Sequence, residues 1–315
     1  MMKNKKGLEM SFAWIFAVFV GALIIFFAVF FAGEFAQRKM FGINVQAAKQ
    51  FAGLLEPLQT TVGEKTIMPL EMKSETRIYS FCNLNEPFGE NRIQFSEKNQ
   101  LSDEWTDPGN DIGVKNHYLF TESMIEEKKF YFFTIPLYMP FKIADLMIVY
   151  SKEYCFVNPP EKIKDSINSF QNRSNIKIIG TNGKCEGIKV CFGSENCDIN
   201  VRCLGDLCSE GEVIKGKEHV YFVDELIYGA IFSDPKNYEC NVKRIINFRL
   251  AKLAEIYQDK AQFVSTKGCN TDMVNEMSLL SNSASRFSKG SQLSEISRLA
   301  EEINEKNMGL QCRLY

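Results

Sequence analysis

Five of the ten cysteines fall within 24 residues, and they are the strongest chemical feature of this 315-residue chain: Cys185, Cys191, Cys197, Cys203 and Cys208. Cysteines at this density either bind a metal ion or form disulfides. Zinc ligands usually come in close pairs, but here four or five residues separate successive cysteines and no Cys-x-x-Cys pair occurs. We therefore expect disulfides rather than a metal site. Because five is odd, at least one member pairs outside this cluster or stays free.

The remaining cysteines are spread along the chain, at Cys82, Cys155, Cys240, Cys269 and Cys312. An even total suits disulfides in an oxidising compartment. One pairing can be predicted: if the helices that begin near Pro235 and Ser291 pack antiparallel, the start of the first lies beside the end of the last. Cys240 and Cys312 would then meet. The alternative is that both are buried thiols.

Catalytic signatures are scarce. The chain has two histidines, His117 and His219, and neither belongs to a His-Glu-x-x-His pair. Gly-x-Ser-x-Gly and the full phosphate-loop pattern Gly-x-x-x-x-Gly-Lys-Ser/Thr are also absent. A cysteine nucleophile with a histidine base stays open, as does a carboxylate-pair hydrolase, which leaves no sequence signature. The sequence assigns no catalytic, metal or cofactor site.

These residues follow a long apolar segment. Residues 11–33 contain no charged side chain, and a helix of that length reaches about 34 Å, enough to cross a bilayer. The alternatives are a buried core helix and a cleaved secretory signal. A cleaved signal has an apolar stretch of only about 7 to 15 residues and small residues at its cleavage site. We therefore expect an uncleaved signal anchor at the cell membrane.

Flanking charges predict the orientation of this helix. Lys3, Lys5 and Lys6 precede it, whereas Arg38 and Lys39 follow it with one acid. This bias favours a cytoplasmic stub over residues 1–10 and an extracytoplasmic domain. Beyond the apolar run, 34 basic side chains face 38 acidic ones. A nucleic-acid partner therefore has no electrostatic support.

Two weaker signals concern partners and modification. Ala13, Ala17 and Gly21 place small residues four apart on the membrane helix, which would let a second copy approach closely. Small residues are also common in membrane helices without that role. Asn172 begins an Asn-Arg-Ser glycosylation acceptor, a triplet that chance also produces.

The rest of the chain divides by its pattern. Residues 34–57 continue with an amphipathic helical pattern, and residues 66–233 form a β-rich α+β ectodomain. Within it, residues 130–150 are expected to form two buried strands, and the segment from Asp145 to Gly180 a strand-helix-strand unit with parallel strands. Asn182-Gly183 is typical of a hairpin turn between the strands on either side.

Residues 234–315 form a C-terminal helical subdomain. Asp234 can cap a helix with Pro235 in its first turn, and further helices are expected over 272–281 and 291–306. The predicted fold class is α+β, with a transmembrane helix, its amphipathic extension, a disulfide-bearing ectodomain and these helices.

Two segments carry a resemblance to known proteins. They are Lys6-Gly7-Leu8-Glu9-Met10-Ser11-Phe12-Ala13-Trp14-Ile15-Phe16 and Tyr238-Glu239-Cys240-Asn241-Val242-Lys243-Arg244. They resemble segments of uncharacterised archaeal single-pass membrane proteins, which implies an anchored chain and no particular activity. A looser similarity is to type IV pilins and pseudopilins, which implies cleavage after Gly7 and packing into a filament. The chain departs from that pattern, because Glu9 would be the second residue after cleavage rather than the fifth.

Together these features predict a membrane-anchored, surface-exposed structural or interaction protein without catalysis or cofactor, with an unknown protein partner. The alternatives are an anchored extracytoplasmic enzyme such as a hydrolase, and a pilin-like assembly subunit.

Overall fold

The structure is a computed structural model that describes residues 14–31, 67–85, 88–99, 103–114, 116–170, 175–193, 197–269 and 271–315. The predictions for residues 34–57, for Ala13 and for Asn172 lie outside these ranges.

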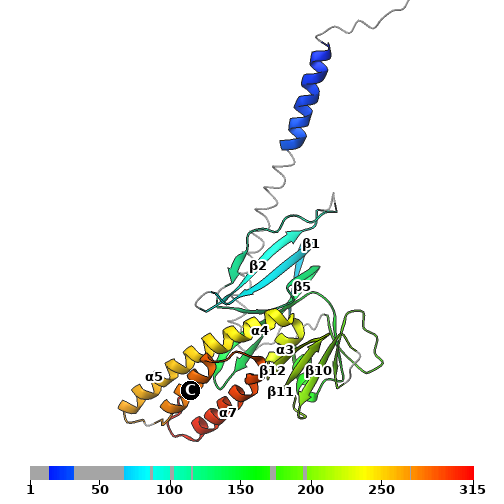
Figure 1. Ribbon diagram of the computed structural model, residues 1–315. Coiled ribbons are helices and arrows are strands. Elements are labelled where there is room, and N and C mark those ends of the chain that lie inside the picture. The colour runs from blue at the N-terminus through cyan, green and yellow to red at the C-terminus, as the bar shows by residue number, and fades with distance from the viewer. Residues whose placement is uncertain are drawn as a thin grey trace, which may run out of the picture.

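The N-terminal apolar helix is present, spanning Trp14–Phe31 (blue in Figure 1). Its mean hydropathy is 2.8 and none of it is buried against the rest of the chain. Among the described residues it is the one helix long and apolar enough to cross a membrane, although a signal sequence has the same properties. Ala17 and Gly21 lie within it, and no neighbouring atom lies within 4 Å of a Cβ placed on Gly21. Self-association through this face stays a prediction.

Two six-stranded sheets lie in the described part of the chain. The first has the order β3-β2-β1-β5-β6-β4, in which all neighbours are antiparallel except β4 and β6. Its strands are β1 (Met68–Asn83), β2 (Glu90–Glu97), β3 (Ile112–Val114), β4 (Tyr118–Phe120), β5 (Met124–Tyr138) and β6 (Lys142–Tyr150). The prediction of two buried strands over 130–150 is confirmed, because β5 and β6 form an antiparallel pair.

The second sheet has the order β12-β11-β10-β9-β7-β8. Strands β8, β7, β9 and β10 run parallel, and β11 and β12 follow as antiparallel neighbours. The strands are β7 (Tyr154–Val157), β8 (Ile176–Ile179), β9 (Ile188–Phe192), β10 (Ile199–Leu204), β11 (Glu210–Lys215) and β12 (Glu218–Val223).

One prediction for this sheet is confirmed and one is wrong. Strand β7, helix α2 (Glu161–Ser169) and strand β8 form the expected parallel strand-helix-strand unit. The hairpin predicted at Asn182-Gly183 does not form. Strand β7 lies between β8 and β9, since Phe156 pairs with Ile178 on one side and with Val190 on the other. A local turn does occur, with the Gly183 N–H donating to Gly180, but it does not join neighbouring strands.

The helices follow β12. They are α3 (Leu226–Phe232), α4 (Pro235–Lys243), the π-helix η1 (Arg244–Leu250), α5 (Ala251–Thr266), α6 (Val274–Ser285), the 3₁₀ turn η2 (Gly290–Gln292) and α7 (Leu293–Gly309). The predicted cap is confirmed: the Asp234 side chain accepts from the Asn237 N–H, and Pro235 is in the first turn. Segments α4, η1 and α5 follow one another without interruption, and Figure 1 shows α5 and α7 running out from the sheets.

The main hydrophobic core joins the strands to the helices. Helices α3 and α4 contact strands of both sheets, and the core runs from Phe133 in β5 through Phe232 in α3 to Val213 in β11. Residues of α5, α6 and α7 extend the same core. A second, smaller core that includes Ile93, Phe95 and Phe130 involves only residues of the first sheet and its connections. The boundary between residues 233 and 234 stays a prediction.

Candidate functional site

All ten cysteines lie in the described part of the chain, and they form five disulfides. The pairs are Cys82–Cys240, Cys155–Cys185, Cys191–Cys197, Cys203–Cys208 and Cys269–Cys312. The expectation of disulfides over a metal site agrees with this arrangement. The odd member of the dense cluster is Cys185, which pairs outside it with Cys155.

The pairing predicted for Cys240 with Cys312 is wrong. Helix α6 lies between α5 and α7 in the chain and packs against both. Two successive reversals of direction make the first and third helices of such a series parallel. The end of α7 therefore lies beside the end of α5, where Cys312 meets Cys269, and Cys240 at the start of the series meets Cys82 of β1.

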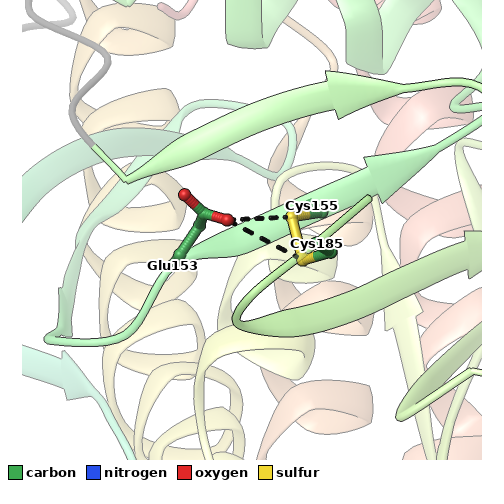
Figure 2. A group of neighbouring side chains, drawn as sticks. All are labelled: Glu153, Cys155 and Cys185. Atoms are coloured by element: carbon green, nitrogen blue, oxygen red, sulfur yellow. Dashed lines mark hydrogen bonds between the residues drawn. A yellow bond between two sulfur atoms is a disulfide. The ribbon is translucent and has the colours of Figure 1, made fainter. Parts of the chain in front are cut away.

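One acidic side chain approaches a disulfide. Glu153 Oε1 lies 3.4 Å from Cys155 Sγ and 4.0 Å from Cys185 Sγ (Figure 2). The three residues could form a metal-binding group only with free thiolates, but the two sulfur atoms are bonded to each other. Lys177 also pairs with Glu153 at 2.5 Å, and its hydrogen bond lowers the pKa of that carboxyl. This group is therefore a structural contact rather than a metal site.

A larger feature is an open groove of about 950 Å³ on the second sheet. We call it the strand-end groove. It is lined by Asn158, Pro160, Phe192, Gly193, Val201, Arg202, Cys203, Leu204, Gly205, Asp206, Gly211, Glu212 and Tyr221. Three large apolar side chains of the lining are accessible to solvent. Leu204 is 62% exposed, Tyr221 is 44% exposed and Phe192 is half-buried.

The position of this groove follows from the strand order. Asn158 follows the carboxyl end of β7, Phe192 ends β9 and Leu204 ends β10, so the groove begins where three parallel strands end. Strands β7 and β9 are neighbours, but their connections run in opposite directions across the sheet. The chain leaves β7 for β8 at one edge, and it leaves β9 for β10 toward the other edge. Such a switch point opens a crevice at the carboxyl ends of the strands, where ligands of α/β sheets bind.

Two short disulfides lie beside the groove. Cys191–Cys197 joins the end of β9 to a residue two positions before β10. Cys203–Cys208 closes the loop that carries Asp206 and Leu207, and Leu207 is 71% exposed. Four of the five cysteines of the dense cluster thus lie beside the groove, whereas Cys185 pairs with Cys155. The loop that Cys203–Cys208 closes has less conformational entropy to lose when a ligand binds.

Strand register explains which side chains reach the groove. Val201, Val213 and Val220 are cross-strand neighbours and are buried in the core. The residue next to each of these valines points to the opposite face, which places Arg202, Glu212 and Tyr221 side by side at the surface.

Three of the polar groups beside the groove form a row. Glu212 Oε2 lies 3.1 Å from His219 Nδ1, and Glu212 Oε1 lies 3.1 Å from Arg202 Nη1. The hydrogen bond with His219, followed by that with Arg202, lowers the pKa of Glu212. Asp206, in contrast, is exposed, and no ion pair joins it to another described residue. The groove therefore combines apolar surface, a neutralised ion pair and one carboxylate.

The described structure does not assemble the catalytic dyad considered from the sequence. Every cysteine is in a disulfide, so no thiol is available as a nucleophile for His117 or His219. His117 contributes its carbonyl to Arg244, and His219 pairs with Glu212. Residues 211–217 have the glycine and lysine spacing of a phosphate loop, but they form β11 and its turn to β12 rather than the start of a helix.

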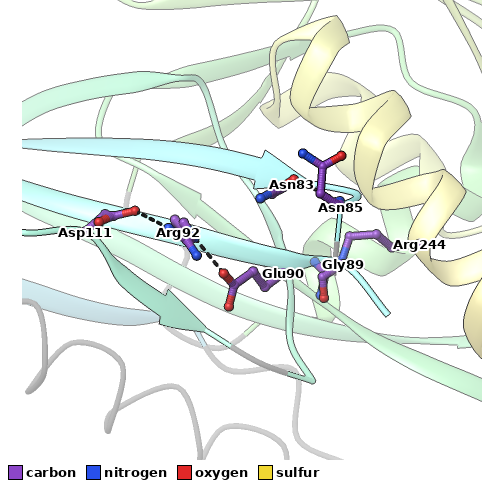
Figure 3. Close-up of polar contacts among 7 residues, drawn as sticks. All are labelled: Asn83, Asn85, Gly89, Glu90, Arg92, Asp111 and Arg244. Carbon is purple, nitrogen blue, oxygen red and sulfur yellow. Dashed lines mark hydrogen bonds and ion pairs between the residues drawn. The ribbon is translucent and has the colours of Figure 1, made fainter. Parts of the chain in front are cut away.

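A separate cluster of polar groups surrounds Arg244, the first residue of η1. Figure 3 shows the Arg244 side chain extending toward Gly89, in the turn before β2. Arg244 is 1% exposed. Its guanidinium donates to the carbonyls of Phe88, Gly89 and His117 and to the side chains of Asn91 and Asn241.

No carboxylate is among these acceptors, and burial lowers the pKa of Arg244 to about 10. Gly89 has φ +59°, and a Cβ there would lie 2.8 Å from the Arg244 side chain, so both backbone and space require glycine. The nearby Arg92, by comparison, makes ion pairs with Glu90 and Asp111. Because Arg244 is enclosed by protein acceptors, its role is to join α4 to the first sheet.

Sequence reasoning identified the cysteines that frame the strand-end groove, but not Phe192, Leu204 or Tyr221. Comparison of the chain with protein-family models, with curated proteins and with solved structures found no match.

Proposed function

We propose that this chain is a membrane-anchored binding protein. Its N-terminal helix holds it in the cell membrane with the N-terminus in the cytoplasm, and its disulfide-bonded domain binds a partner in the strand-end groove. The role is one of interaction rather than catalysis.

The anchor and its orientation are supported by three properties of the chain. The helix Trp14–Phe31 is long and apolar enough to span a bilayer. Basic residues are in excess on its N-terminal side, which favours a cytoplasmic N-terminus. Five disulfides persist in oxidising compartments and are rare in the cytosol.

The observation that carries the binding role is the groove itself. It lies at the switch point of a largely parallel sheet, it exposes Leu204 and Tyr221, and the Cys203–Cys208 disulfide closes one of its loops. Large apolar side chains exposed in a concave surface mark binding sites. The lining residues include no serine, threonine or free cysteine that could act as a nucleophile.

Photo-crosslinking in the native membrane tests this proposal. The photoreactive residue benzoylphenylalanine replaces Leu204 in the full chain, and adducts are detected after irradiation by gel mobility and intact mass. We expect an adduct that depends on position 204, because a bound partner would lie against this exposed side chain.

The matched control carries the same photoreactive residue at Ile256, which is 50% exposed on α5 and does not line the groove. Equal labelling at both positions, or no adduct at position 204, would contradict a binding role for the groove.

A further inference from the structure

Resting on the proposed function, we infer that the partner enters the strand-end groove as an extended polypeptide segment with aliphatic or aromatic side chains and a lysine or arginine. Three properties of the groove carry this inference: its length, its lining and its charge.

The length of the groove suits an extended chain. Its lining residues come from five neighbouring positions of the second sheet, from the end of β7 across β9, β10 and β11 to β12. Neighbouring strands lie about 4.8 Å apart, so four steps span roughly 19 Å. An extended polypeptide advances about 3.3 Å per residue, and about six residues therefore fit along the groove.

The lining favours apolar side chains. Phe192, Leu204 and Tyr221 lie along the groove, with Pro160 at one end of it. Leu204 is exposed, so its burial against an aliphatic side chain of the partner would favour binding. Gly193 and Gly205 add no side chain to the lining, which lets a bound chain approach the groove closely at these two positions.

The charge of the groove favours a basic residue in the partner. Arg202 and Glu212 neutralise each other at 3.1 Å, and Asp206 is the groove carboxylate that no described residue pairs. A lysine or arginine of the partner would pair with it. The same carboxylate disfavours phosphate, sulfate and acidic chains, because no lining cation other than Arg202 is described.

Peptide selection provides the first test. The full chain in detergent micelles is used to select from a phage-displayed library of random eight-residue peptides, and the selected pool is sequenced. We expect enrichment of aliphatic and aromatic residues, and of lysine and arginine over aspartate and glutamate.

A synthetic peptide from the pool, and its variant with glutamate at the basic position, are then measured against designed variants of the chain. Leu204→Asp should weaken binding about tenfold or more, since it removes apolar contact. Asp206→Lys should lower the affinity for the basic peptide about fivefold and raise the affinity for the acidic peptide by a similar factor. The controls are Ile256→Asp and Asp259→Lys, both at exposed positions of α5, and they should leave the affinity for both peptides unchanged.

Inversion of the charge preference by Asp206→Lys would support the inference, because a general loss of structure cannot produce it. Selected peptides with no charge preference, or with affinity unchanged by Leu204→Asp, would overturn it. If no peptide binds but the neutral oligosaccharide maltotetraose binds and Leu204→Asp abolishes this binding, the polypeptide inference fails and the proposed function stands. If neither probe binds in a manner sensitive to Leu204→Asp, both fail.

Discussion

Removing the disulfide between Cys82 and Cys240 is expected to lower the free energy of unfolding by about 5 kcal/mol. This bond joins β1 to α4 across 158 residues of sequence, the longest separation among the five disulfides. Without it the unfolded chain gains the entropy of that loop, which grows with loop length. The double substitution Cys82→Ala and Cys240→Ala, measured by urea denaturation of the full chain in detergent, checks this value.

The matched control is Cys203→Ala with Cys208→Ala, a pair only five residues apart. Its removal should cost about 2 kcal/mol in stability. The Cys203→Ala, Cys208→Ala variant should nevertheless show weaker photo-crosslinking from position 204 than the Cys82→Ala, Cys240→Ala variant, because it frees a loop of the groove. Equal losses of stability for the two pairs would show that loop entropy does not govern the contribution of these bonds.

The second large effect is expected at Arg244. Replacing it by methionine keeps most of the side-chain length but leaves the buried acceptors, the Gly89 carbonyl and the side-chain oxygens of Asn91 and Asn241, without this donor. Each unsatisfied buried acceptor costs about 1 to 3 kcal/mol, partly offset because a buried cation is no longer desolvated. We expect Arg244→Met to lower the free energy of unfolding by about 3 to 5 kcal/mol.

Arg298→Met is the control, since Arg298 is 73% exposed and pairs with Glu302 at 3.9 Å. It should change stability by less than about 0.5 kcal/mol. Urea denaturation measures both variants. A loss below about 1 kcal/mol for Arg244→Met would mean that water or neighbouring groups replace the guanidinium, and that the cluster does not hold α4 to the sheet.

Features that depend on nearby residues were predictable from the sequence. Asp234 caps α4 and Pro235 sits in its first turn, because both effects act within one helical turn. The apolar run 14–31 is a helix, and β7, α2 and β8 form the expected parallel unit. In each case the signal is local, because the hydrophobic periodicity or the turn residues belong to one element or to two elements that follow each other in the sequence.

Features that depend on which elements become neighbours were not predictable in the same way. The Asn182-Gly183 signal is real as a turn, but β7 occupies the position beside β8 that a hairpin requires. The helix predicted over 272–281 is present as α6, but the sequence does not show how it packs, and its packing against both α5 and α7 brings Cys312 to Cys269 instead of Cys240. The π-helix at Arg244 has no sequence signal that distinguishes it from the α-helix around it.

The groove belongs to the same class of feature. Phe192, Leu204 and Tyr221 come from three strands, and their proximity depends on sheet order and register rather than on any spacing in the chain. The cysteine cluster did indicate this region. It could not show that the pairs Cys191–Cys197 and Cys203–Cys208 form beside a groove, because connectivity cannot be deduced from cysteine positions alone.

Non-reducing peptide mapping by mass spectrometry, on protein taken from native membranes, tests the central claim most directly. A disulfide-braced, outward-facing anchored protein predicts an intact N-terminus and five linkages. These are 82–240, 155–185, 191–197, 203–208 and 269–312. Free or metal-bound thiols at these positions would contradict the outward orientation and the braced groove. Loss of the N-terminal residues up to and including the helix Trp14–Phe31, with all five linkages present, would instead contradict the anchor.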